Sequence, residues 1–250
     1  MVKICIPSYN RYFVKTLKII PINLLQDTYI FVNNYNSDEE LDEAVEIYEN
    51  SNAGVKVIGL KTKGIPSARN AIIEHFPGGT HIIMLDDDVE EVLTLKPDPI
   101  MIKNTVEKMN PLEIEQFWLR AFMVCEKNNS KLWGIYPINN PFYMSQKINS
   151  RGFIIGTMFG VITGKLRFDP LLKLKEDYDF TLKHILEYKK VCRFDYITLK
   201  AGHYTNDGGC VQQRKENTGL EKECCDRIMS KYPGLLKRNP KRENEILIAI

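Results

Sequence analysis

Short apolar runs alternate with amphipathic segments through the first hundred residues. The apolar runs predict strands over residues 2–7, 29–33, 55–60 and 80–85. Apolar residues at helical spacing predict helices over residues 38–49 and 67–76. Strands that alternate with helices indicate an α/β fold, here a Rossmann-like, mostly parallel sheet flanked by helices. Ligands of such sheets gather at the carboxyl ends of the strands.

The rest of the chain is less regular. Its periodicity predicts helices over residues 100–109, 111–128, 178–188 and 220–232, and strand-like stretches over 131–136, 152–161 and 191–199. There is no internal repeat, low-complexity tract or linker. We therefore expect a single domain, in which residues 1–205 form the main body and residues 206–250 form a helical, basic extension packed on it.

Composition narrows the class of protein. The 250 residues are 44% hydrophobic and 26% charged, as in globular proteins. No apolar run approaches the roughly 20 residues of a membrane span, and the first residues read as a strand and not as a signal peptide. The six cysteines show neither a CxxC pair nor zinc-like spacing. We expect a cytoplasmic protein with free thiols and no membrane partner.

The most informative motif is the run Asp86, Asp87 and Asp88 at the end of the strand predicted over residues 80–85. Clustered carboxylates beside a buried strand repel one another unless a cation stands among them. Hard divalent ions prefer carboxylate oxygens. Because side chains alternate along a strand, Asp86 and Asp88 can share Mn²⁺ or Mg²⁺ while Asp87 points elsewhere. The alternative is an acidic loop after a core strand.

Other segments at strand ends and helix starts are candidates for binding a nucleotide. A ring at the end of the first strand could stack on a base, and amides after the second could read a base edge. A glycine before a helix with arginine in its first turn attracts phosphate. The predicted donor-binding residues are Pro7, Ser8, Tyr9, Asn10, Arg11, Asn33, Asn34, Gly64, Arg69, Asp86, Asp87 and Gly156. Each segment alone also fits an ordinary turn or helix start.

Two further sites complete the candidate chemistry. Glu176 and Asp177 precede a predicted helix, where we expect Asp177 to be a general base that Glu176 supports. A helix cap is the alternative. His203 follows a predicted strand and could be a third metal ligand, although a lone histidine is more often structural.

Charge is uneven along the chain. The net charge is only +2, but nine basic residues against four acidic ones lie between Arg214 and Arg242. A solvated helix with a basic tail explains this excess, and so does a surface that faces a polyanionic acceptor. The aromatic residues at 133–136 and 142–143 likewise fit either core packing or a wall for a flipped base.

Taken in order, the segments IPSYNR, GIPSARN, MLDDD, KEDYDF and GHY resemble the GT-A class of glycosyltransferases over about residues 4–203. The N-x-GG of residues 206–209 and the ending KYPGLLKRNPKRENEI also resemble the TET-associated glycosyltransferases of bacteriophages. The resemblance implies a nucleotide-diphosphate sugar donor, expected to be a UDP-sugar. It also implies DNA with 5-hydroxymethylcytosine or another hydroxymethylpyrimidine as acceptor. We expect in-line attack at the anomeric carbon, which would invert its configuration.

Three other functions fit parts of the sequence. A GT-A enzyme that acts on a polysaccharide, lipid or protein would share the donor site. A nucleotidyltransferase also uses carboxylates and a metal on an α/β sheet, but it releases pyrophosphate. A non-enzymatic DNA-binding module fits the basic segment, yet its carboxylate cluster would repel phosphate.

Overall fold

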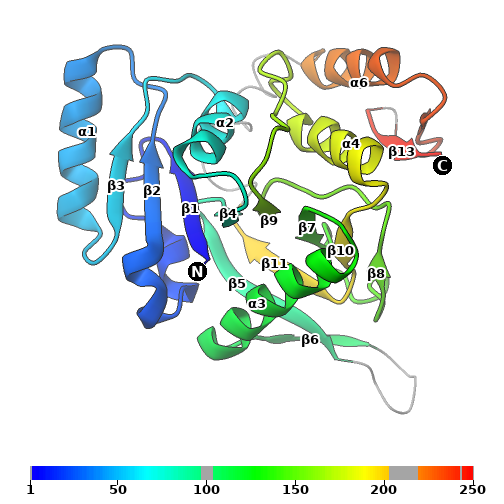
Figure 1. Ribbon diagram of the computed structural model, residues 1–250, viewed down its shortest axis with the longest axis horizontal. Coiled ribbons are helices and arrows are strands. Elements are labelled where there is room, and N and C mark those ends of the chain that lie inside the picture. Colours follow the sequence, from blue (N-terminus) through cyan, green and yellow to red (C-terminus); the bar gives the residue numbers. More distant parts are fainter. Residues whose placement is uncertain (1, 97–103, 203–218, 243, 250) are drawn as a thin grey trace.

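A mixed sheet flanked by helices forms the body of the protein in the computed structural model, which describes residues 2–96, 104–202, 219–242 and 244–249 (Figure 1). The strand order is β3-β2-β1-β4-β9-β7-β10-β8. These strands are β1 Lys3–Ser8, β2 Thr28–Val32, β3 Lys56–Gly59, β4 His81–Leu85, β7 Leu132–Ile135, β8 Ile148–Asn149, β9 Met158–Ile162 and β10 Cys192–Phe194. Strands β3, β2, β1 and β4 are mutually parallel, whereas β9 and β8 run antiparallel to their neighbours. The expected mostly parallel α/β fold is confirmed.

Alternating side chains on these strands build a core on each face of the sheet. Ile4 and Ile6 of β1 belong to one hydrophobic cluster, and Cys5 belongs to the other. Helices α1 (Asp38–Ser51) and α3 (Pro111–Lys127) contribute to the first cluster. Helices α2 (Ile65–His75) and α4 (Glu176–Tyr188) contribute to the second. Because both faces are covered, the strands read as near-continuous apolar runs.

A second, three-stranded sheet continues from the end of β4. Its order is β11-β5-β6, with β5 at Val89–Lys96, β6 at Thr105–Lys108 and β11 at Ile197–Ala201. The 3₁₀ helices η1 (Lys15–Ile19) and η2 (Ile22–Asp27) lie between β1 and β2 in the chain, and η1 contacts β5. The chain therefore passes directly from one sheet to the other through the acidic run.

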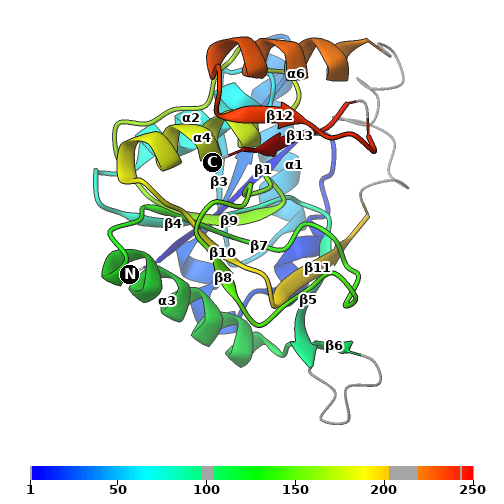
Figure 2. The same cartoon turned by 90° about the vertical axis from the view of Figure 1, so that its right-hand side faces the viewer.

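The C-terminal residues form a compact unit on the outer side of α4. This C-terminal unit consists of α6 (Leu220–Lys231) and the antiparallel strands β12 (Leu236–Arg238) and β13 (Ile246–Ile248). Figure 2 shows it above α4, with α3 on the opposite side of the main sheet. Leu182 of α4 shares a third hydrophobic cluster with Cys225 and Ile228 of α6.

Some expected elements differ from the structure. The helix expected over 100–109 is wrong, because Thr105–Lys108 is a strand that pairs with β5, while residues 100–103 lie outside the described part. The strand expected over 191–199 is two strands in different sheets. Of the stretch over 152–161, only its end is a strand, β9, and the basic tail contains β12 and β13. No helix in the described ranges is both long and apolar enough to cross a membrane.

Candidate active site

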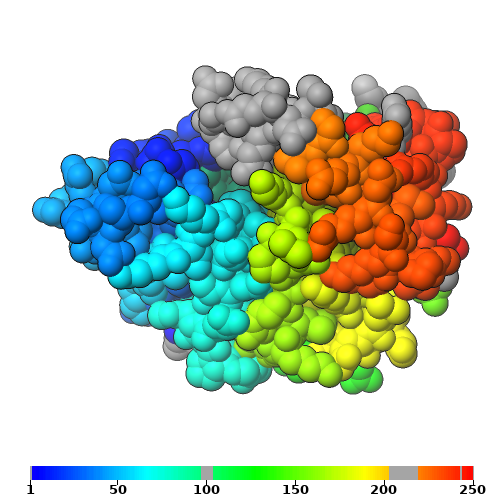
Figure 3. All heavy atoms as spheres, turned by 90° about the horizontal axis from the view of Figure 1, so that it is seen from above, coloured from blue at the N-terminus to red at the C-terminus, as the bar shows by residue number. Residues whose placement is uncertain are grey.

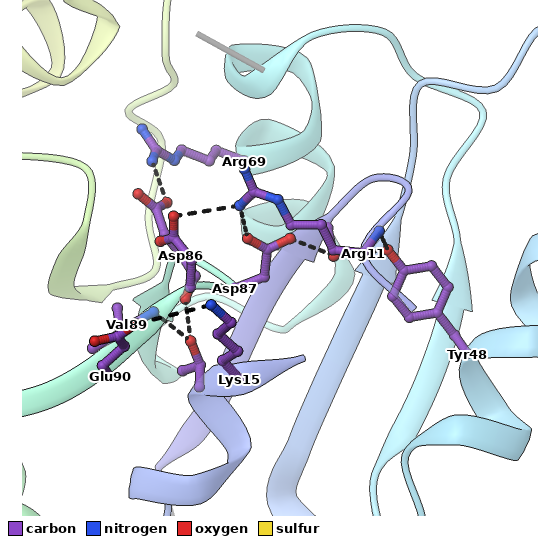
Figure 4. Close-up of polar contacts among 11 residues, drawn as sticks. Arg11, Lys15, Tyr48, Arg69, Asp86, Asp87, Val89 and Glu90 are labelled. Atoms are coloured by element: carbon purple, nitrogen blue, oxygen red, sulfur yellow. Dashed lines mark hydrogen bonds and ion pairs between the residues drawn. The ribbon is translucent and has the colours of Figure 1, made fainter. Parts of the chain in front are cut away.

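The carboxyl ends of β1 and β4 lie side by side where the strand order reverses. From β1 the chain builds outward to β2 and β3, then returns to place β4 on the other side of β1. The register Cys5↔Met84 aligns the two strand ends. Ligands of α/β sheets bind at such a switch point. Figure 4 shows Arg11, from the segment after β1, and Arg69, from α2, reaching the acidic run that follows β4.

Asp87 ties the acidic run to the segment after β1. Its Oδ2 accepts a 2.6 Å hydrogen bond from Ser8 Oγ, and its Oδ1 pairs with Arg11 Nη1. The Tyr48 hydroxyl of α1 lies 2.8 Å from Ser8 Oγ and accepts a 3.0 Å hydrogen bond from the Arg11 backbone N–H. Burial raises the pKa of the Asp87 carboxyl, and the charge of Arg11 opposes this rise. Three predicted donor-binding residues thus contact one another.

The two outer carboxylates differ in exposure. The Asp86 side chain is 29% exposed, and its Oδ1 lies 3.4 Å from Arg69 Nη2. The Asp88 side chain is 7% exposed, and its Oδ2 lies 3.5 Å from Arg11 Nη1. Thr16 of η1 holds the backbone, because its Oγ1 donates a 2.6 Å hydrogen bond to the Asp86 carbonyl and accepts one from the first N–H of β5. Asp86 is therefore the member of the run most open to a ligand.

Asp86 and Asp88 offer the hard oxygen donors that Mg²⁺ and Mn²⁺ prefer. These ions often take one or two protein carboxylates and complete their shells with water and substrate phosphates. Within the described ranges, no three His, Cys, Asp or Glu side chains form a metal cluster. The predicted ligand His203 lies outside those ranges, although the preceding residue, Gly202, donates a 3.4 Å hydrogen bond to the Asp88 carbonyl. The donor pair fits a cation that is shared with a diphosphate.

Arg69 joins the acidic run to the carboxylates of α4. It is 3% exposed, and its Nη1 donates a 2.6 Å hydrogen bond to Glu176 Oε1. Its Nη2 donates a 2.9 Å hydrogen bond to the Gly156 carbonyl. The N–H of the same glycine donates a 2.9 Å hydrogen bond to Asp177 Oδ2. The structure thus brings Arg69, Gly156, Glu176, Asp177 and Asp86 into one network.

Burial makes both carboxyls of α4 weaker acids. It raises the pKa of Glu176 to about 7, with a further increase from Asp177 and an opposing effect of Arg69. Burial also raises the pKa of Asp177. The charge of Arg69 and the hydrogen bonds that Asp177 accepts from two backbone N–H groups oppose this rise. Perturbed carboxyls that share a site with an acidic strand end indicate acid–base chemistry.

The remaining predicted donor-binding residues line the ends of β1 and β2. Tyr9 is 39% exposed, and its ring centroid lies 5.2 Å from that of Tyr35. The Tyr35 hydroxyl donates a 2.9 Å hydrogen bond to Asn10 Oδ1. The Gly64 N–H donates a 3.4 Å hydrogen bond to Asn34 Oδ1 at the start of α2. The exposed Tyr9 ring therefore packs on the half-buried Tyr35, which follows the asparagine that accepts from the start of α2.

Two other predicted residues are part of the scaffold. Pro7 pairs with Phe31 within the sheet, and the buried Asn33 donates its backbone N–H to the Ser8 carbonyl at 3.3 Å. Sequence reasoning missed Thr16, Tyr35 and Tyr48. Thr16 carries no motif, Tyr35 lies in a polar loop, and Tyr48 was read only as part of the apolar face of a helix.

The aromatic segments divide between core and surface. Trp133 is fully buried against α3 residues, where its ring packs edge-on against Phe117 and Phe122. In contrast, Phe142 is 82% exposed and Tyr143 is 59% exposed. They lie in the loop that begins at the carboxyl end of β7, which runs parallel to β4. Only the second segment is accessible to a ligand.

Comparison with solved structures shows the GT-A fold. The chain is similar to the mannosyltransferase PcManGT from Pyrobaculum calidifontis, solved with GDP-Man and Mn²⁺, with 12% identity, a TM-score of 0.52 and coverage of 91% of this chain and 64% of that one. TarS 1–349 of S. aureus gives 16% identity, a TM-score of 0.49 and coverage of 91% and 65%. The chain thus spans slightly less than two thirds of both.

Sequence comparison identifies the family. No curated protein matches the chain. Residues 3–167 match the family described as glycosyl transferase family 2. This match begins with β1, includes the acidic run and extends through β9. Because it covers more than half of the sequence, the chain belongs to glycosyl transferase family 2.

Proposed function

We propose that this protein transfers a sugar from a nucleotide-diphosphate sugar, with a UDP-sugar as the expected donor, to a hydroxyl group. One observation carries the proposal: Arg69 joins the acidic strand end, through Asp86, to the paired carboxylates of α4. The acidic strand end suits binding of a metal-bound diphosphate, and the carboxylates of α4 suit removal of a proton. The complex of PcManGT with GDP-Man and Mn²⁺ supports such a donor and metal.

Asp177 is the proposed general base. The acceptor oxygen forms a bond to the anomeric carbon while the bond from that carbon to the diphosphate breaks and its electrons leave with the nucleotide. The acceptor proton passes to the Asp177 carboxylate, and attack in line with the leaving group inverts the configuration. Glu176 holds Arg69 beside the base, and burial raises the pKa of both carboxyls.

The donor half uses the acidic run. Asp86 and Asp88 would hold Mg²⁺ or Mn²⁺, and such an ion, when bound, neutralises charge on the departing diphosphate. The exposed ring of Tyr9 offers a stacking surface for the base. The helix dipole at the N-terminus of α2 favours phosphate beside Gly64.

For the acceptor we propose a hydroxymethylpyrimidine in DNA. The resemblance to TET-associated glycosyltransferases points to it, and two surface features support it. Phe142 and Tyr143 are exposed rings on which a base could stack. The C-terminal unit and the turn between its strands expose basic side chains, although Arg238 is paired with Asp226. The exposed basic residues are Lys222, Arg227, Lys231, Lys237, Arg238, Lys241 and Arg242, of which Lys231 is paired with Asp169 and Asp179.

One experiment tests donor and acceptor together. The protein is incubated with Mn²⁺, a panel of UDP-sugars and DNA that contains 5-hydroxymethylcytosine, and the DNA is then digested to nucleosides and weighed. We expect the modified nucleoside to gain the mass of one sugar, while DNA with unmodified cytosine gains none. Release of UDP without any gain in nucleoside mass would support the proposed donor and refute the DNA acceptor. Release of pyrophosphate would indicate nucleotidyl transfer.

Two variants test the assigned roles. Asp177→Asn should lower kcat at least about 10²-fold and leave UDP binding unchanged, because only the base is lost. Asp88→Ala should lose both transfer and its stimulation by metal. Asp42→Asn, an exposed position on α1, is the control and should behave as wild type. Near-wild-type transfer by Asp177→Asn would refute the base, and metal-stimulated transfer by Asp88→Ala would refute the metal site.

A further inference from the structure

The helix that carries Glu176 and Asp177 begins at a residue in an unusual conformation. Lys175 adopts a left-handed backbone with φ of 58°, a region that residues other than glycine seldom occupy. Its carbonyl accepts hydrogen bonds from the N–H groups of Tyr178 at 3.1 Å and Asp179 at 3.3 Å. The position of Lys175 therefore fixes the first turn of α4, where both carboxylates lie.

The Lys175 side chain contacts the C-terminal unit. It is 6% exposed, and its Nζ lies 3.7 Å from Glu221 Oε1 of α6 and 3.6 Å from Glu245 Oε1 beside β13. The ammonium also sits 4.9 Å from the ring centroid of Tyr178, whose hydroxyl donates a 3.1 Å hydrogen bond to Glu245 Oε2. A buried charge persists only when it is paired, so this contact is specific.

A second contact joins the same turn to the C-terminal unit. Asp179 has no exposed surface, and its Oδ1 accepts a 2.7 Å hydrogen bond from the Tyr232 hydroxyl. The same oxygen lies 2.7 Å from Lys231 Nζ at the end of α6. Figure 3 shows the orange surface of α6 beside the yellow-green surface of the segment that precedes α4. Two buried polar contacts therefore hold one helical turn.

We propose that the C-terminal unit positions the catalytic carboxylates Glu176 and Asp177. Lys175 is the positioning residue, because its contacts with this unit fix the first turn of α4. The proposal rests on the proposed glycosyl transfer, because it assigns a consequence for kcat. Lys175 does not touch the reacting atoms in this scheme. It keeps Asp177 where Gly156 can donate to it and where the acceptor proton can reach it. A displacement of about 1 Å at a catalytic group can cost about 10²-fold in rate.

The test uses substitutions at both ends of one helix. Lys175→Met keeps the length of the side chain and removes its charge, whereas Lys175→Arg keeps the charge. Lys189→Met is a matched control, since Lys189 is also left-handed, with φ of 69°, and ends the same helix at an exposed position. Tyr232→Phe removes only the hydroxyl that contacts Asp179, and it replaces Lys175→Met if that variant does not fold.

We expect Lys175→Met to lower kcat for sugar transfer about 10- to 100-fold while the KM for the nucleotide sugar stays within about twofold. Lys175→Arg should recover most of this loss, and Lys189→Met should match wild type. A merely structural role would lower thermal stability and the fraction of folded enzyme. Because such a loss alone lowers the apparent kcat at constant KM, kcat is calculated per folded enzyme. An unchanged kcat, or an equal effect at position 189, would overturn the proposal.

Hydrogen exchange separates this proposal from the proposed function. Amide exchange over residues 175–180 should be faster in Lys175→Met than in wild type, with no such change in Lys189→Met, whether or not a substrate is known. Exchange at the wild-type rate in Lys175→Met would refute the proposal that the C-terminal unit stabilises the first turn of α4. If wild type transfers no sugar with any donor, the proposed function fails, and so does the predicted effect on kcat. Faster exchange in Lys175→Met would even then support stabilisation of the first turn of α4 by the C-terminal unit.

Discussion

Gly156 is the position at which the charged network of the site is most sensitive to the volume of an added side chain. Its N–H donates a hydrogen bond to Asp177, and its carbonyl accepts one from Arg69. A Cβ on this residue would lie 2.4 Å from Arg69 Nη2. No real Cβ tolerates that distance, so the absence of a side chain is what allows a buried guanidinium to reach both Glu176 and the glycine carbonyl.

We therefore expect Gly156→Ala to displace the Arg69 guanidinium. Overpacking of this kind costs about 1–3 kcal/mol of stability, and the shift of Arg69 should lower kcat by about 10-fold or more. Urea unfolding and transfer kinetics measure the two effects. Gly164→Ala is the control, because its Cβ would meet nothing closer than the Tyr188 hydroxyl at 3.8 Å. Equal behaviour of the two variants would contradict the role of Gly156.

At the scale of elements, the start of α2 combines a helix dipole with a backbone that only glycine adopts easily. Gly64 has φ of 79° and ψ of 156°, and its carbonyl accepts the hydrogen bond that opens the helix from Ala68 N–H at 3.1 Å. A side chain at this φ and ψ is strained by roughly 1–3 kcal/mol. The start of the helix therefore depends on Gly64 for its direction.

Gly64→Ala should weaken the binding of UDP about 3- to 10-fold if α2 directs its N–H groups at the diphosphate. Isothermal titration measures the dissociation constant. The matched control is Gly78→Ala, where a Cβ meets nothing within 4 Å and φ is not positive. A dissociation constant unchanged from wild type would place the diphosphate away from this helix.

Elements with a strong apolar period could be predicted from the sequence, and those formed by distant pairing could not. The strands expected before the acidic run are present as β1 to β4, because each is a short, mostly apolar run bounded by turn residues. In contrast, the segment of β6 was expected to be helical, and Val106 and Met109 have the i, i+3 spacing of one helix face. Its strand conformation comes from pairing with β5, which the local pattern does not contain.

The same distinction holds for the candidate site. Strand ends and helix starts pointed to Ser8, Arg11, Asp86 and the carboxylates of α4, and the structure gathers these at one edge of the sheet. Their roles in binding and catalysis stay predictions. Thr16 and Tyr48 join the site through hydrogen bonds to residues that are far away in the sequence, so no local motif could have indicated them.

At the scale of the whole molecule, three hydrophobic clusters surround a buried charged network. Two cover the faces of the main sheet, and the third joins α4 to the C-terminal unit. Arg69 and Glu176 lie between β4 and α4, with 4% and 9% of their side chains exposed. Carboxyls desolvated in this way make the stability of the fold depend on pH.

The direction of that dependence follows from Glu176. Its pKa is about 7 in the folded chain, against an ordinary value of 4.5 that the unfolded chain should approach. Between pH 4.5 and 7 the folded chain therefore binds more protons than the unfolded chain, and the free energy of unfolding falls as pH rises. The raised pKa of Asp177 acts in the same direction, whereas the lowered pKa of Asp169 acts only below its ordinary value of 3.8, where it makes stability rise with pH.

Glu176→Gln removes the titrating group while it keeps an oxygen that can accept from Arg69. We expect wild type to lose stability on the order of 3 kcal/mol from Glu176 between pH 4.5 and 7, and the variant to show a flatter curve. Urea unfolding at half-unit steps of pH measures both. Parallel curves for the two proteins would mean that Glu176 is ionised throughout. Its ion pair with Arg69 would then outweigh its burial.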